Sequence, residues 1–139
     1  MIFKSYLFSC LLVFFIACAG NEKDNTITGT WEYEKLEHVS GNEEYLLDSA
    51  VMEAHERNNG LTFTFGDDQT YAVTKRNPGK PDELISKGTF VFSKDKNLLL
   101  TKTTDGTTGQ LQVIELSGKI LKINTLPTSE EYIVLKKNN

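Results

Sequence analysis

Few side chains of the types that carry out chemistry occur in this sequence, and their spacing does not bring them together. His38 stands in a run with strand character and His55 in a run with helical character. The segment Glu53-Ala54-His55-Glu56 lacks the second histidine of a zinc-binding helix, so we expect both histidines at the surface. Asp67-Asp68 has the charge to bind calcium, but an acidic hairpin turn explains both residues. The sequence therefore predicts no catalytic residue, no metal site and no cofactor.

The remaining reactive group is the thiol of Cys18, which follows an apolar leader. Met1 to Lys4 carries one positive charge, and the run from Tyr6 to Ala17 is almost entirely apolar. A charged start, a short apolar run and a small residue before the cleavage point predict a signal peptide over residues 1–17. The apolar run is shorter than the roughly 20 residues of a membrane-spanning helix, so we expect the leader to be removed.

The tetrapeptide Phe15-Ile16-Ala17-Cys18 resembles the lipobox of bacterial lipoproteins, whose cysteine is lipidated and becomes the first residue of the mature chain. The resemblance implies that Cys18 anchors the protein in a membrane and that residues 18–25 form a lipidated cysteine and a solvated tether. Ala19 is not the aspartate that retains enterobacterial lipoproteins in the inner membrane, so we expect the outer membrane, on its periplasmic face or at the cell surface. Two alternatives stay open, namely cleavage near Ala19 as an ordinary secreted protein and a surface-export signal at Glu22-Lys23-Asp24.

The cysteine count and the net charge limit the partners. Cys10 leaves with the leader, so the mature chain has no second cysteine for an internal disulfide and its stability must come from the core. The formal net charge of −4 argues against nucleic acid as a partner and against an electrostatic attraction to anionic lipid.

From residue 26 to residue 139 the chain is long enough for one domain, and its pattern is that of short strands. Apolar and polar residues alternate in runs that Gly, Asn, Asp and Pro interrupt, which predicts hairpins. We predict strands over residues 31–39, 61–65, 70–74, 84–93, 98–103, 110–116, 119–126 and 131–136. Closing such a sheet removes its exposed edges, so we predict an all-β fold, an eight-stranded antiparallel up-and-down barrel.

Residues 43–59 interrupt this series with a helical pattern. Apolar residues recur there at helical spacing: Leu47, Ala50, Val51 and Ala54. Ser40 with Glu43 could cap the helix, but we favour Asp48 as the cap and Asn59-Gly60 as the stop. A short helix between the first two strands would lie over one opening of the barrel.

Alternation also assigns side chains to the barrel interior. The inward set is Trp31, Tyr33, Phe63, Phe65, Tyr71, Val73, Phe90, Phe92, Leu98, Leu100, Leu111, Val113, Leu121, Ile123, Ile133 and Leu135. Within it, the candidates for ligand binding are Tyr33, Phe63, Phe65, Tyr71, Phe90, Phe92 and Leu100. Eight strands enclose a space that side chains fill or that holds one small ligand. In the alternative these residues only fill a core, because a roughly 110-residue domain without disulfides needs most of its apolar residues for stability.

The start Gly29-Thr30-Trp31, the order of eight strands and the basic end Leu135-Lys136-Lys137 resemble the lipocalins, and most of all the small bacterial lipoproteins described as lipocalin-like. The resemblance covers residues 26–137. It implies that Trp31 plugs one end of the barrel against a basic side chain of the last strand, Lys136 or Lys137, of which we assign Lys136. Such a cation–π contact contributes about 0.5–2 kcal/mol. A helix after the first strand, and no Thr-Asp-Tyr-type motif before the seventh, depart from the lipocalin pattern.

The sequence supports two functional hypotheses. In the first, the protein is a membrane-tethered binding module, not an enzyme, that holds a small hydrophobic ligand in or at the mouth of the barrel, with the helix gating access. In the second, a filled barrel serves as a scaffold that contacts an envelope protein partner through its outer face or through the loop from Arg76 to Glu83. Under both hypotheses we expect a monomer.

Overall fold

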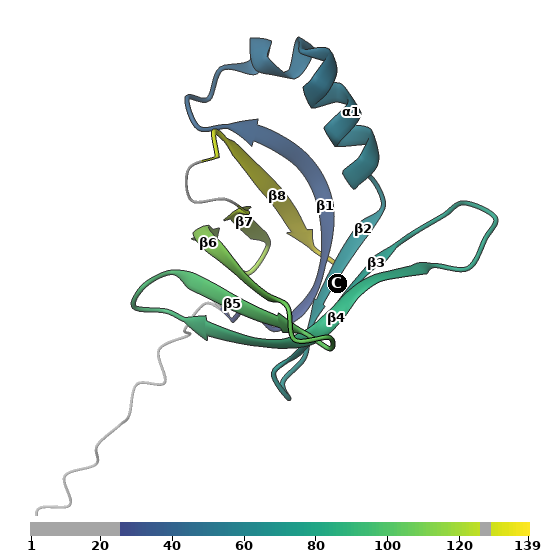
Figure 1. Cartoon of the computed structure of the whole chain (residues 1–139). Coiled ribbons are helices and arrows are strands. Elements are labelled where there is room, and N and C mark those ends of the chain that lie inside the picture. Colours follow the sequence, from purple (N-terminus) through teal and green to yellow (C-terminus); the bar gives the residue numbers. More distant parts are fainter. Residues whose placement is uncertain (1–25, 126–128) are drawn as a thin grey trace, which may run out of the picture.

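Eight strands pair in chain order into one closed antiparallel barrel (Figure 1). The computed structural model describes residues 26–125 and 129–139. Its elements are β1 (Gly29–His38), η1 (Glu43–Leu47), α1 (Ser49–Asn58), β2 (Leu61–Phe65), β3 (Thr70–Lys75), β4 (Glu83–Ser93), β5 (Leu98–Thr103), β6 (Thr108–Leu116), β7 (Ile120–Asn124) and β8 (Glu131–Lys137). The barrel closes because β8 pairs with β1 as well as with β7. The predicted all-β, eight-stranded up-and-down barrel with one helix between its first two strands is confirmed.

The predicted signal peptide over residues 1–17, the cysteine at position 18 and the tether that follows it lie outside the described residues. Within the described part of the chain, no helix has both the length and the apolar character needed to cross a bilayer.

The hairpin turns form where polar residues interrupt the alternation. Between β2 and β3, Asp68 Oδ1 accepts hydrogen bonds from the backbone N–H of Thr70 at 3.1 Å and from its hydroxyl at 2.6 Å. These hydrogen bonds hold the pKa of Asp68 below its usual range. Gln69 beside it takes a positive φ of 64°. Asp68 thus has a structural role in the turn.

One end of the barrel is filled by apolar side chains packed around Trp31. Trp31 is fully buried, and its Nε1–H donates a hydrogen bond to the carbonyl oxygen of Ile27 at 2.8 Å. The other side chains that are almost completely buried are Leu99, Leu121, Ile123 and Leu135. We call the Trp31 end the closed end; the turns β2–β3, β4–β5 and β6–β7 lie there.

The opposite end carries η1 and α1, and we call it the helix end (Figure 1). Asp48 begins α1 as predicted, because its Oδ1 accepts a hydrogen bond from the Ala50 N–H at 2.8 Å. Asn59 ends it, since its N–H donates to the His55 carbonyl oxygen at 2.9 Å. Val51, which is 5% exposed, and Ala54 pack against the core, so the helix is joined to the barrel by one narrow apolar face.

The prediction for the leucines of β5 is wrong by one residue. Leu98 and Leu100 were expected to face the interior, with Leu100 as a ligand contact. Instead Leu99 is fully buried, and Leu100 is 43% exposed on the outer wall. The register decides the face, because Leu99 pairs with the inward-facing Phe92 and Leu111 on the two neighbouring strands.

Candidate functional site

Most of the aromatic side chains predicted to bind a ligand lie inside the barrel and fill it. Those that are buried are Tyr33, Phe65, Tyr71 and Phe90. Phe63 and Phe92 are half-buried against the same core. The rings of Phe65 and Phe90 meet edge to face with centroids 5.1 Å apart, so each occupies space that a ligand would need. The closed end is therefore a packed core.

Burial varies around the barrel wall at the same level of the strands. The inward-facing side chains of Val73, Leu111 and Ile133 are half-buried, although they pack against the core. Their paired neighbours Leu99 and Ile123 are almost completely buried. The interior is therefore packed along most of its length, and the exposed apolar side chains next to the helices are Leu46, Leu47 and Met52.

A cavity of about 280 Å³ lies between the helix segment and β1. We call it the helix pocket; its lining residues are Lys35, Leu36, Leu46, Val51, Met52, His55 and Glu56. The apolar members come from β1, η1 and α1, and the three polar members give the same pocket ionisable and hydrogen-bonding groups. Such a lining, apolar with a few polar groups, is typical of small-molecule sites.

Two local features of the sequence produce the helix pocket. A β-bulge between Tyr33 and Lys35 shifts the alternation of β1 by one residue, so that Leu36 turns inward and is 3% exposed. Leu46 and Met52 keep 42% and 54% of their surface exposed at the edge of this space. Large apolar side chains left in contact with solvent beside a cavity are a feature of binding sites.

A hydrogen bond joins the floor of this region to the helix. Tyr33 Oη on β1 and His55 Nδ1 on α1 lie 2.8 Å apart, and their ring centroids are separated by 5.5 Å. Burial raises the pKa of Tyr33 to about 12, so the phenol is neutral at physiological pH. The contact fixes α1 over β1 on the side of the pocket where the histidine lies.

The two histidines occupy separate places. His38 packs its ring on Tyr45 with centroids 4.6 Å apart, and its Nε2 lies 3.5 Å from a carboxylate oxygen of Glu130. His55 is exposed apart from its contact with Tyr33. Among the residues that the structure describes, no group of three or more His, Cys, Asp or Glu side chains is placed to hold a metal ion.

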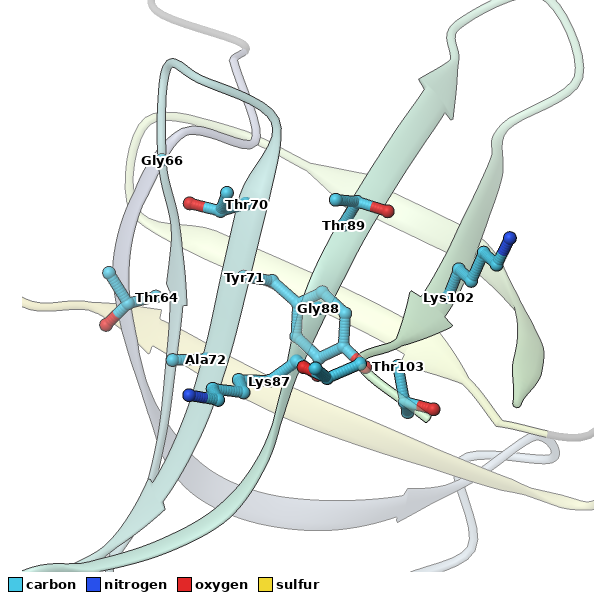
Figure 2. Close-up of a pocket in the computed structure, with 11 residues that line it drawn as sticks. Thr64, Gly66, Thr70, Tyr71, Ala72, Lys87, Gly88, Thr89, Lys102 and Thr103 are labelled. Atoms are coloured by element: carbon cyan, nitrogen blue, oxygen red, sulfur yellow. The ribbon is translucent and has the colours of Figure 1, made fainter. Parts of the chain in front are cut away.

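A larger and shallower groove of about 750 Å³ runs over the outer wall across β2, β3, β4 and β5 (Figure 2). Threonine side chains such as Thr64, Thr70 and Thr89 line it, together with Lys87 and Lys102. A second groove of about 510 Å³ continues over β4, β5 and β6 past the exposed Val91 and Leu100. The Leu100 side chain thus belongs to this outer groove and not to the interior.

The plug of the closed end uses Lys137 and not Lys136. Lys137 Nζ lies 5.3 Å from the ring centroid of Trp31, whereas Lys136 is exposed. The register pairs Trp31 with Lys137 and Glu32 with Lys136, which turns Lys136 outward. Gly29 has a φ of 132°, and a Cβ there would lie only 2.9 Å from Lys137 Cε. Glycine in the Gly-x-Trp segment therefore leaves room for the lysine to reach the indole.

An ion pair reinforces the outer wall of β1. Lys122 Nζ lies 2.9 Å from Glu37 Oε1 and 3.7 Å from Glu115 Oε2. The hydrogen bond from Lys122 holds the pKa of Glu37 below its usual range, and the same contact raises the pKa of Lys122. The pair therefore links β1 to β7 across the intervening β8.

The sequence prediction missed Leu36, Leu46 and Met52 as site residues. Leu36 had a visible signal, because the run Trp31-Glu32-Tyr33-Glu34-Lys35-Leu36 places its last apolar residue one position out of step, as a bulge does. Leu46 and Met52 had none, since a helical pattern does not say how closely a helix will sit on a barrel.

Comparisons with known proteins agree with this architecture. The sequence profile of the lipocalin-like domain family matches residues 27–123. A lipocalin-like protein from Bacteroides uniformis superposes with a TM-score of 0.55 at 9% identity, over 80% of this chain and 97% of the other. A protein from Bacteroides eggerthii gives a TM-score of 0.56 at 11% identity, over 80% and 98% of the two chains. A second protein from Bacteroides uniformis gives 0.51 at 19% identity, over 81% and 88%. No curated protein matches the sequence.

Proposed function

The chain belongs to the lipocalin-like domain family, and on that premise we propose that it is a lipid-anchored envelope protein that binds a small apolar ligand in the helix pocket. The observation that carries the proposal is the cavity of about 280 Å³ whose apolar lining lies between α1 and β1. The packed interior supports this placement, because the rings of Phe65 and Phe90 occupy space that a ligand would need, whereas Met52 stays exposed beside the helix pocket. Binding, and not catalysis, is the proposed activity.

The size of the helix pocket limits the ligand and its affinity. Ligand pockets usually fall in the range of about 300–1,000 Å³, so this one suits a small molecule or one arm of a larger one. Burying about 200 Å² of apolar ligand surface would contribute about 5 kcal/mol at about 25 cal/mol per Å², which corresponds to a Kd near 0.2 mM. Tighter binding requires α1 to move outward and admit more of the ligand.

The anchor is the second part of the proposal. Lipidation of Cys18 would attach the domain to the outer membrane through a short polar tether, at the periplasmic face or the cell surface. Mass spectrometry of the mature amino-terminal peptide tests it directly. We expect an acylated Cys18 as the first residue; an unmodified chain beginning near Ala19 would contradict the anchor and leave the pocket proposal standing.

A matched pair of substitutions tests the pocket. Met52 lines it and is half-exposed, so Met52→Trp should fill it and weaken binding of an apolar naphthylamine dye at least tenfold. Leu47→Trp is the control, because Leu47 is 79% exposed on η1 and does not line the pocket. Dye fluorescence, excited directly, measures both affinities. Equal binding by the two variants and the parent protein would refute the proposal.

The outer wall supports the alternative, a scaffold that recognises its partner on the barrel surface. Val91 and Leu100 pair across β4 and β5, are 56% and 43% exposed, and line the 510 Å³ groove. If Leu100→Lys abolishes dye binding while Met52→Trp leaves it intact, the apolar site is this outer groove and the helix pocket is not used.

A further inference from the structure

The side-chain charges of the described residues are distributed unevenly along the barrel axis. At the closed end, the turns and the end of β8 carry five lysines: Lys94, Lys96, Lys119, Lys136 and Lys137. The acidic residues at that end are Asp67, Asp68 and Asp95 in the turns and Glu32 on β1, which pairs with Lys136. The closed end is therefore basic by an excess of about one charge at neutral pH.

The helix end has the opposite sign. Its β1–β2 segment alone carries five carboxylates, at Glu43, Glu44, Asp48, Glu53 and Glu56, against the single cation Arg57. The β3–β4 and β5–β6 loops and the described part of the β7–β8 loop, with the strand residues that flank them, add five more carboxylates against three cations. The acidic character of the whole chain thus comes from one end of the molecule.

The lysines of the closed end are available to a partner. Lys94, Lys96, Lys119 and Lys136 are exposed, and none of the four has an ion-pair partner within the described residues. The backbone N–H of Lys137 donates to the Lys119 carbonyl oxygen at 2.8 Å, which places the β6–β7 turn beside the end of β8. Lys119 and Lys136 therefore lie close together, and the β4–β5 turn with Lys94 and Lys96 lies at the same end of the barrel.

The chain also enters the domain at this face. Ile27, two residues before β1, is buried and accepts the hydrogen bond from the Trp31 indole. Twenty-five residues precede the described chain, and they include the proposed lipid attachment at Cys18. An attachment through that segment would therefore join the domain at its closed end.

We propose that the closed end of the barrel is a docking surface for the anionic headgroups of a phospholipid bilayer, so that the helix end and its pocket face away from the membrane. Basic side chains next to an anionic membrane surface gain electrostatic attraction within a Debye length, and acidic side chains are repelled. The basic closed end and the acidic helix end both favour the same orientation. The proposal concerns the surface alone and does not depend on what the helix pocket binds.

The single tryptophan makes the orientation measurable. Trp31 lies at the closed end, so energy transfer from it to dansyl-labelled headgroups reports how closely this end approaches the bilayer. The mature protein is reconstituted into vesicles of phosphatidylcholine, with or without phosphatidylglycerol. We expect greater transfer on the anionic vesicles, reduced by high salt.

Two charge-matched variants provide the test. The triple change Lys94→Glu, Lys96→Glu and Lys119→Glu should lower the docked-to-undocked ratio at least about fivefold per lysine. The control changes Lys80, Lys87 and Lys102 to Glu, which alters the net charge equally at exposed positions away from the closed end. This control should keep most of the transfer seen with the parent protein.

The outcomes separate clearly. Loss of transfer in the closed-end variant but not in the control supports the proposal, provided that circular dichroism shows both variants folded. Equal transfer on anionic and neutral vesicles, or equal loss in both variants, overturns it. Flotation of the protein with vesicles at high salt reports the acyl anchor alone, so failure of the anchor is distinguished from failure of the docking surface.

Discussion

The two ends of this barrel differ in how completely they are filled. At the closed end, Trp31, Leu99 and Leu135 are completely buried. At the helix end, Leu46 and Met52 remain about half-exposed beside a cavity. The comparison shows that the closed end supplies the packed core, whereas the helix end leaves apolar surface uncovered.

This difference has a physical reason. A domain of roughly 110 residues has a net stability of only about 5–15 kcal/mol, so an unfilled interior along the whole barrel would be hard to sustain without disulfides. The cavity is confined to one end, under a helix that is joined to the barrel mainly by Val51, Ala54 and the Tyr33–His55 contact. This placement limits the loss of stability that the cavity causes.

The largest expected effect is loss of the plug. Trp31→Ala should lower the free energy of unfolding by about 3–5 kcal/mol, because it leaves a large cavity in the packed end and removes the Lys137 cation–π contact. Met52→Ala at the helix end should cost less than about 1 kcal/mol, since Met52 is already 54% exposed. Urea unfolding followed by far-ultraviolet circular dichroism measures both. Similar decreases in the free energy of unfolding for the two variants would contradict the difference in packing between the two ends.

A neighbouring pair of leucines gives the next largest effect and sharpens the comparison within one strand. Leu99→Ala should cost about 3 kcal/mol, because its side chain is completely buried between β4 and β6. Leu100→Ala should cost about 0.5 kcal/mol or less, since its side chain lies on the outer wall and is 43% exposed. The melting temperatures of the two variants test the register of β5. A larger decrease for Leu100→Ala than for Leu99→Ala would mean that Leu100 faces the interior.

The smallest effect concerns the outer wall and depends on pH. Glu37→Gln should cost about 0.5 kcal/mol near neutral pH, because it removes a partly exposed ion pair with Lys122. The pKa of Glu37 is lowered in the folded state, so this stability is present above the pKa of an unfolded glutamate and is lost as pH falls through the lower folded value. The pKa of Lys122 is raised in the folded state, so at alkaline pH the stability from this ion pair is lost only as pH rises through that higher pKa.

Melting temperatures between acid and neutral pH test this prediction. The difference between the parent protein and Glu37→Gln should vanish in acid. Glu115→Gln is the matched control, because its carboxylate is 3.7 Å from the same Lys122 Nζ and is more exposed, and it should have a smaller effect. A constant difference at all pH values would mean that Glu37 acts through packing and not through its charge.

The barrel itself could be predicted because the residues that specify its strands and turns act on their neighbours in the sequence. Turn residues such as Gly66-Asp67-Asp68 and Asn59-Gly60 mark the ends of strands and helix, and they act within a few positions. The Asp48 cap was likewise readable, since its partner is the backbone N–H two residues later. Eight short strands in series then leave few arrangements other than closure.

Register could not be predicted, because it depends on the facing strand. In Leu98-Leu99-Leu100 all three side chains are apolar, so alternation does not indicate which of them faces the interior. Only the pairing with Phe92 and Leu111 identifies Leu99 as the inward residue. The choice between Lys136 and Lys137 beside Trp31 has the same origin, since it follows from the pairing of β1 with β8.

The candidate site was predictable only in outline. A helix over one opening follows from its position between the first two strands, but the helix pocket depends on the distance at which α1 stands from β1. The charge distribution was also out of reach, because a single net value of −4 does not show that Lys94, Lys96 and Lys119 lie at one end while most carboxylates lie at the other.

The meeting of β1 and β8 brings the first and last strands of the domain side by side. The Asn138 N–H donates to the Thr30 carbonyl oxygen at 2.8 Å, and the two strands pair along their length. A short peptide could therefore join these ends, and new termini in the loop at residues 77–82 would give a circular permutant with every strand pair retained. A lipid attached at those new termini would hold the molecule upside down, with its acidic face toward the headgroups.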